Sequence, residues 1–399
     1  MKSDRLEPRS FKLLYLLTFL FFSANAVTHV TVPLQTASTG ASNATTGIVT
    51  GAYMLACMVA RPWAGYLVRR YGAGPLLRAT LIAYMPVMAV FPFADPAGLL
   101  AVRLLQGGCT ACFSMALQIG MIDALPEHRR AHGVSLYSLS TYAPAVVMPV
   151  AGIRIWEIGE TFLYAGVMFA LMAAVGTVGY VAVPHLQGAG ETLSRDDGTN
   201  HRSQRLRALG NPDFLVCSFS MLAASVAFGA VSAFIPLYAA QLGEYDAGIF
   251  LALQAATVVT VRFVWRKRIP SGGRWPGRLI AGLLSLVAAA SCLLALAGWT
   301  GPFGFYSAAV LMGIAQALLY PTLMTHLTFE LPNTARNVLL GLFIASADLG
   351  VALGGIAMGP VADLGSYPTV YATCAGGALL AACLAVGRED LSKNQKASP

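Results

Sequence analysis

The chain alternates long apolar stretches with short polar ones, and this alternation constrains its fold more than any other feature. About twelve stretches approach the roughly 20 residues that a helix needs to cross the hydrocarbon of a bilayer. Hydrophobic residues make up 56% of the chain and charged residues only 11%, whereas soluble domains carry about 25% charged residues. We therefore predict an all-α integral membrane protein. The expected spans are residues 12–34, 46–68, 75–93, 97–123, 132–155, 161–183, 213–239, 246–265, 278–298, 302–326, 336–359 and 368–387.

The charged residues between the spans follow an alternating pattern. The net charge is +8, and most Lys and Arg residues lie at the termini or in every second loop, as at Arg69, Arg70 and Lys267. The other loops carry acids, such as Asp95 and Glu157. Because basic loops stay on the cytoplasmic side of a membrane, we expect a multi-pass protein with both termini in the cytoplasm. This placement of the basic charge argues against nucleic acid as a partner.

One long polar segment divides the spans into two groups of six. It covers residues 185–212, so we predict an N-terminal half at 1–184, a cytoplasmic linker at 185–212 and a C-terminal half at 213–399. The halves contain weak echoes of each other, which indicate a parallel repeat. The aligned positions are Gly47 with Gly248, Ile48 with Ile249, Arg61 with Arg262, Arg103 with Gly313, and Gln106 with Gln316.

Two motifs resemble the major facilitator superfamily. The loop after the second span, residues 65–72 (GYLVRRYG), resembles its gating-loop motif, and Arg103-x-x-Gln106-Gly107 resembles its fourth-span motif. The resemblance covers essentially the whole chain. It implies the major facilitator fold of two six-helix halves, with a substrate site between them near mid-membrane. It also implies a gating role for Gly65, Arg69, Arg70 and Gly72, although the family usually has an aspartate where Arg69 stands.

Short segments, mainly in the first half, are similar to exporters of staphylopine-type opine metallophores. This narrower resemblance implies outward transport of a small polar metallophore across a bacterial cytoplasmic membrane, driven by protons. We expect a monomer in the lipid bilayer, with no cofactor. The segments are residues 21–26 (FFSANA), 51–55 (GAYML), 61–65 (RPWAG), 113–115 (FSM), 122–126 (IDALP) and 133–138 (GVSLYS).

Three arginines within the spans are candidate substrate-binding residues. A guanidinium group can bind a carboxylate through two hydrogen bonds, so Arg61, Arg103 and Arg262 suit a substrate with several carboxylates. The alternative for Arg61 and Arg262 is structural: their charged ends can extend to lipid headgroups or bind backbone carbonyls. Arg103 lies deeper, and its position in the fourth-span motif favours a role in function.

Two aspartates are candidates for proton coupling. Asp348 is expected near the middle of the eleventh span, where burial suits a carboxyl group that binds and releases a proton. Asp123 lies about one turn from the cytoplasmic end of the fourth span. The alternative for Asp123 is pairing with Arg69, Arg70 or Arg130 in a gate network, and the alternative for Asp348 is a structural pairing.

Other polar side chains can join a substrate cavity in the membrane. Asn25 and His29 lie one turn apart on the first span and share a face. Cys109 and Cys112 form a CxxC pair in an apolar span without nearby histidines, which favours packing over a metal site. The sequence shows no phosphate-binding loop and no nucleophile–base motif, so we do not predict an enzyme. The further cavity candidates are Tyr53, Gln106, Tyr137 and Gln254.

Two other functions fit parts of the pattern. A drug/proton antiporter of the same superfamily would need a carboxylate exposed in a first-half cavity, where the sequence offers arginines instead. A membrane sensor or scaffold without transport is the alternative from a different class. Movement of solute into liposomes distinguishes a transporter from a scaffold.

Overall fold

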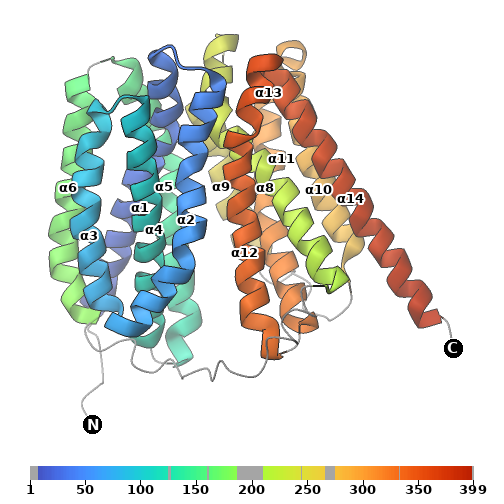
Figure 1. Cartoon of the computed structure of the whole chain (residues 1–399), viewed down its shortest axis with the longest axis horizontal. Coiled ribbons are helices and arrows are strands. Elements are labelled where there is room, and N and C mark those ends of the chain that lie inside the picture. Colours follow the sequence, from blue (N-terminus) through green and yellow to red (C-terminus); the bar gives the residue numbers. More distant parts are fainter. Residues whose placement is uncertain are drawn as a thin grey trace. The chain divides into compact units, whose positions relative to one another are not determined.

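The computed structural model of the chain is almost entirely helical (Figure 1). It describes the backbone of residues 8–124, 127–159, 161–186, 210–243, 245–265, 275–331 and 333–397. Within these residues, 12 helices are long and apolar enough to cross a membrane. The prediction of about twelve spans is therefore confirmed.

The chain divides into two compact units, Met1–Ala41 with Ile48–Arg195, and Ser42–Gly47 with Asp196–Pro399. The first unit contains α1 (Pro8–Ser38), most of α2 (Asn43–Tyr71), α3 (Ala73–Val90), η1 (Phe91–Phe93), α4 (Pro96–Ala124), α5 (Glu127–Glu157), α6 (Thr161–Ala182) and η2 (Val183–Leu186). The second contains α8 (Pro212–Leu242), α9 (Ala247–Trp265), α10 (Gly277–Ala295), α11 (Ala297–Glu330), α12 (Asn333–Ile356), α13 (Met358–Leu364) and α14 (Tyr367–Ala397).

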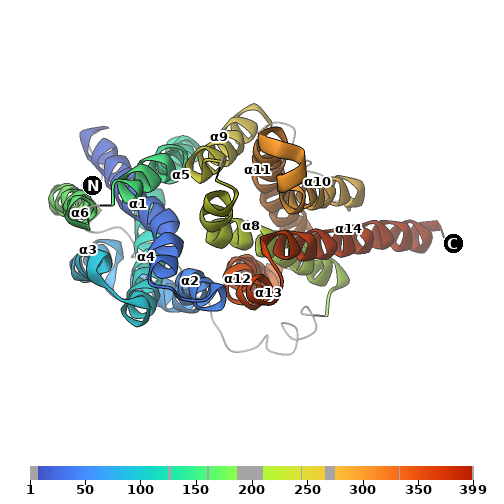
Figure 2. The same cartoon turned by 90° about the horizontal axis from the view of Figure 1, so that it is seen from above.

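The first unit is built around α1, which packs against α5 and α6, while α3 packs against α4 and α6 (Figure 2). Aromatic rings fill the space between α1, α3 and α4. Phe21 stacks on Phe113 with ring centroids 3.7 Å apart, and Tyr84 lies 4.4 Å from Phe21 on the other side. All three rings are buried. This core brings the middle parts of the three helices together.

In the second unit, α8 packs against α12 and α14. Glycines allow the close approach of α8 and α12, as is common between membrane helices. A Cβ atom added at Gly229 would lie 2.2 Å from the carbonyl oxygen of Val351, and one at Gly354 would lie 2.3 Å from that of Val226. Only residues without a side chain fit at these two contacts.

Several helix ends differ from the predicted spans. The predicted eleventh span, 336–359, is divided between α12 and α13, and α11 contains a kink at Gly301, where φ is +68°. Helix α8 begins at Pro212, inside the predicted linker, because the side-chain oxygen of Asn211 accepts the N–H groups of Asp213 and Phe214. Most of that linker, residues 187–209, lies outside the described residues.

The second unit includes the first residues of α2, Ser42–Gly47. The carboxylate of Asp363 accepts the backbone N–H groups of Asn43 and Ala44 at 2.9 and 2.8 Å. A carboxylate at this end of a helix satisfies free N–H groups and interacts favourably with the helix dipole. Nothing near residue 43 in the sequence indicates that its capping group lies in α13.

Candidate functional site

A network of polar side chains lies inside the first unit, with Gln106 of α4 at its centre. The side-chain amide nitrogen of Gln106 donates to Asn25 Oδ1 at 2.7 Å and to Thr28 Oγ1 at 2.9 Å. Its oxygen accepts a hydrogen bond from Arg103 Nη1 at 3.0 Å. Because both polar ends of the amide are bonded, the orientation of Gln106 is determined by α1 on one side and by Arg103 on the other.

Asn25 extends this network to α3. The hydroxyl of Tyr84 donates to Asn25 Oδ1 at 3.1 Å, and Asn25 Nδ2 donates to Thr110 Oγ1 at 3.5 Å. All of these side chains are buried. Polar groups without water nearby need such partners, because an unpaired one costs free energy.

Arg103 is the charged member of the network and has no exposed surface. Its Nη2 donates to the carbonyl oxygen of Thr50 at 3.2 Å, and its guanidinium carbon lies 4.5 Å from the ring centroid of Tyr53. Its Nε has no hydrogen-bond partner within the described part of the chain. The guanidinium therefore meets a backbone carbonyl, an amide oxygen and an aromatic face, and none of these three groups is an anion. A cation buried in this way makes the surrounding site strongly favourable to a negatively charged group.

Local helix geometry brings these residues together. Arg103 and Gln106 are three residues apart on α4, and Asn25 and His29 are four apart on α1, so each pair shares a helix face. The imidazole of His29 meets the ring of Tyr53 edge-on, with centroids 4.8 Å apart. The predicted candidates Asn25, His29, Tyr53, Arg103 and Gln106 therefore lie in one connected site.

Two more of the predicted first-half candidates are only half-buried. Arg61 is half-buried, about 12 Å further along α2 than Tyr53 at 1.5 Å per residue. Tyr137 lies on α5, where it is half-buried and packs against the apolar core of the unit. Both side chains retain partial exposure, which Arg103 lacks.

The second unit has a related but simpler contact. Gln254 of α9 is buried and donates to the side-chain oxygen of Gln316 in α11 at 3.1 Å. A Cβ atom at Gly313 would lie 2.7 Å from the backbone oxygen of Gln254. Gly313, which the predicted repeat aligns with Arg103, therefore lies against the backbone of α9 and carries no charge. Arg262, the last predicted arginine, is half-buried near the end of α9.

Of the two proton-coupling candidates, the structure describes the side chain of Asp348 alone. Asp348 is 9% exposed and lies on α12, two residues before Gly350, which packs closely against α8. The side chain of Asp123 lies outside the described residues.

The predicted gating residues lie in the last turns of α2 and, for Gly72, in the turn to α3. Gly72 has φ +84°, a conformation that favours glycine, and its N–H donates to the carbonyl of Val68 at 2.8 Å. Arg69 and Arg70 are exposed. Arg70 Nη1 donates to the hydroxyl of Tyr66 at 2.9 Å. Gly65 lies one turn earlier, opposite the side chain of Met115.

Sequence reasoning missed four residues of the network. Thr28, Thr50, Tyr84 and Thr110 come from four different helices, and threonine is common in membrane helices, where its hydroxyl bonds to the preceding turn. Thr28 makes that local bond to the carbonyl of Asn25 as well as accepting from Gln106. No spacing within the sequence distinguishes such residues from ordinary packing threonines.

Comparison with known proteins supports the same architecture. The sequence pattern of the Major Facilitator Superfamily matches residues 14–306. The chain is 43% identical over 363 residues to the staphylopine export protein of Staphylococcus aureus, covering 90% of this chain and 91% of that protein. It is 23% identical over 289 residues to an uncharacterized MFS-type transporter of Burkholderia mallei, covering 71% of this chain and 66% of that protein.

Solved structures of transporters share the fold at low sequence identity. A bacterial homolog of the human lysosomal transporter Spinster, in an inward-facing and unoccupied conformation, matches with a TM-score of 0.69, 16% identity and coverage of 95% and 94% of the two chains. A variant of the nucleoside transporter NupG matches with a TM-score of 0.72, 14% identity and coverage of 95% and 99%. The helices, the matched pattern and the similar proteins together show that this chain belongs to the major facilitator superfamily.

Proposed function

We propose that this chain exports a small polar opine-type metallophore across the bacterial cytoplasmic membrane in exchange for protons. It works as a monomer, by alternating access of its two six-helix halves, and catalyses no covalent chemistry. The 43% identity to a staphylopine export protein over 90% of the chain supports the substrate class and the direction. The alternating basic loops support an orientation with both termini in the cytoplasm.

The observation that carries this proposal is the buried charge of Arg103, which meets a carbonyl, an amide oxygen and an aromatic ring but, among these contacts, no anion. An opine metallophore carries several carboxylates, which a positive site attracts. In a medium of low dielectric constant this attraction acts over several ångströms. Arg61 and Arg262 are half-buried, so we assign them direct contact with substrate carboxylates, while Arg103 supplies charge from its fully buried position against the ring of Tyr53.

Transport into membrane vesicles tests this function. Inverted vesicles from cells that express the protein are expected to take up an opine metallophore when their interior is acidified, and right-side-out vesicles are not. Dissipating the proton gradient is expected to stop the uptake. Absence of metallophore uptake, with proton-driven uptake of lipophilic cations instead, would overturn the proposal in favour of a drug/proton antiporter. Absence of uptake of either solute would favour a sensor or scaffold.

Replacing Asp348 with asparagine is expected to remove the coupling to protons. The substitution preserves the size of the side chain, so the protein should reach the membrane in normal amounts. However, a carboxamide cannot bind and release a proton near neutral pH. Uptake by inverted vesicles should therefore no longer respond to the pH gradient. A normal response in the variant would show that Asp348 is structural, and Asp123 or His29 would become the next residue to test.

A further inference from the structure

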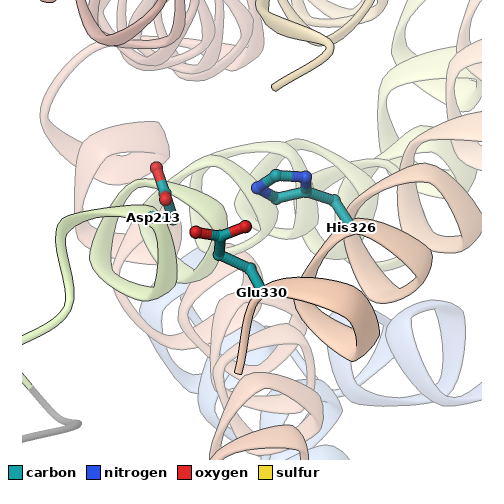
Figure 3. A group of neighbouring side chains, drawn as sticks. All are labelled: Asp213, His326 and Glu330. Atoms are coloured by element: carbon teal, nitrogen blue, oxygen red, sulfur yellow. The ribbon is translucent and has the colours of Figure 1, made fainter. Parts of the chain in front are cut away.

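The second unit contains a group of metal-ligating side chains that plays no part in the polar network around Gln106. Asp213 lies in the first turn of α8, while His326 and Glu330 lie in the last turns of α11. One ligand atom from each residue lies within 4.8 Å of the other two. Figure 3 shows the imidazole and the two carboxylates turned toward a common space.

His326 is the residue that points to a ligand. Its side chain is only 4% exposed, yet neither ring nitrogen has a hydrogen-bond partner among the described residues. Buried polar atoms are rarely left in this state, because each one loses its bond to water without a replacement. A neutral imidazole always has one nitrogen with a free electron pair. That electron pair and the two carboxylates are all electron donors, so the space between them suits a cation.

The surroundings of Asp213 resemble those of a metal ligand. Arg388 Nε donates to Asp213 Oδ1 at 2.7 Å, which leaves Oδ2 for another partner. Outer hydrogen bonds of this kind commonly orient the carboxylates that bind metals. Trp275 covers the imidazole edge-on, with ring centroids 4.9 Å apart, and is itself held by a bond from its indole nitrogen to the carbonyl of Ala385. The ring of His326 is therefore also restrained.

The ligand types indicate which ion fits. One imidazole nitrogen with two carboxylate oxygens suits a divalent metal such as Zn²⁺ or Co²⁺, and three protein ligands leave a coordination position for water. Ligand atoms bound tetrahedrally at about 2.0–2.2 Å lie roughly 3.4 Å apart, so the group must contract on binding. Glu330 is exposed, and its side chain can make this movement without disturbing the core.

We propose that Asp213, His326 and Glu330 bind one divalent transition-metal ion, which links α8 to α11 at the end of the helices where the long polar segment joins α8. The bound ion joins two helices of the second unit whose ligands Asp213 and His326 lie 113 positions apart in the sequence. The site is separate from the polar network around Gln106, because all of its ligands lie in the second unit.

Binding of Co²⁺ alone to the full-length protein, purified in detergent and without a histidine tag, tests the site. The wild-type protein is expected to bind one equivalent of Co²⁺ with visible absorption bands typical of low coordination number, and Zn²⁺ should displace it. Saturation with Zn²⁺ should also raise the thermal unfolding temperature. Glu330→Gln is expected to weaken binding at least tenfold, and His326→Gln to abolish the bands.

Glu157→Gln is the matched control. Glu157 is an exposed glutamate that pairs with Arg154 at 2.9 Å in the first unit, so this variant should bind Co²⁺ like the wild type. Equal binding by all variants, or the absence of a saturable equivalent in the wild type, would overturn the proposal. The proposal would also be overturned if the wild type bound no metal and its unfolding temperature changed with pH in a way that His326→Gln removed. Asp213, His326 and Glu330 would then share a proton in place of a metal ion.

Discussion

Replacing Arg103 with glutamine is expected to weaken metallophore transport by about tenfold to a hundredfold. The substitution removes the buried positive charge on which the proposed site depends. At an effective dielectric constant of about 20, two unit charges roughly 8 Å apart attract each other by about 2 kcal/mol, and each 1.4 kcal/mol changes an affinity about tenfold. Uptake by inverted vesicles, measured over a range of substrate concentrations and corrected for protein amount, should show a higher KM.

Arg103→Lys distinguishes the charge from the packing of the side chain. Lysine retains the positive charge but loses the planar group that bonds both Gln106 and Thr50. We expect the lysine variant to retain more transport than the glutamine variant. If both variants only lowered the amount of folded protein and left KM unchanged, Arg103 would be a structural residue. A glutamine variant with normal transport would contradict its role in the site.

Gly107→Ala is expected to destabilise the first unit strongly, although it adds a single methyl group. The new Cβ would lie 2.2 Å from the carbonyl oxygen of Tyr53 and 2.9 Å from the Cβ of Ala56, so α2 and α4 must separate. A backbone atom cannot move aside as a side chain does, and overpacking of this kind typically costs about 1–3 kcal/mol. Separation would also move Tyr53 away from Arg103. We therefore expect a lower thermal unfolding temperature in detergent and weaker metallophore uptake by vesicles.

The neighbouring glycine provides the control for this prediction. A Cβ atom at Gly108 would meet nothing within 4 Å, and alanine favours the helix over glycine by up to about 1 kcal/mol. Gly108→Ala should therefore unfold at the same temperature as the wild type or slightly higher, and it should transport normally. If Gly107→Ala and Gly108→Ala lowered the unfolding temperature and the uptake equally, the close contact of α2 with α4 would not explain the effect of Gly107→Ala.

The sequence alone was enough to predict the number and type of the membrane-spanning segments. A segment that crosses a bilayer must satisfy its own backbone and remain apolar over a fixed length, so the hydropathy of short windows reveals each span. For the same reason charged residues such as Arg103 and Asp348 were visible as candidates, because charges are rare in apolar spans. Grouping Asn25 with His29, and Arg103 with Gln106, required only helix periodicity.

Only the tertiary structure showed which side chains of different helices contact each other. The ring of Tyr53 beneath Arg103, the position of Thr28 beside Gln106 and the capping of α2 by Asp363 all join residues far apart in sequence. His326 and Glu330 are four residues apart and could be paired from the sequence, but Asp213 could not be assigned to them. Packing between membrane helices depends on small residues and shape rather than on hydropathy, and the hydropathy of a span does not specify which neighbour its polar side chains meet.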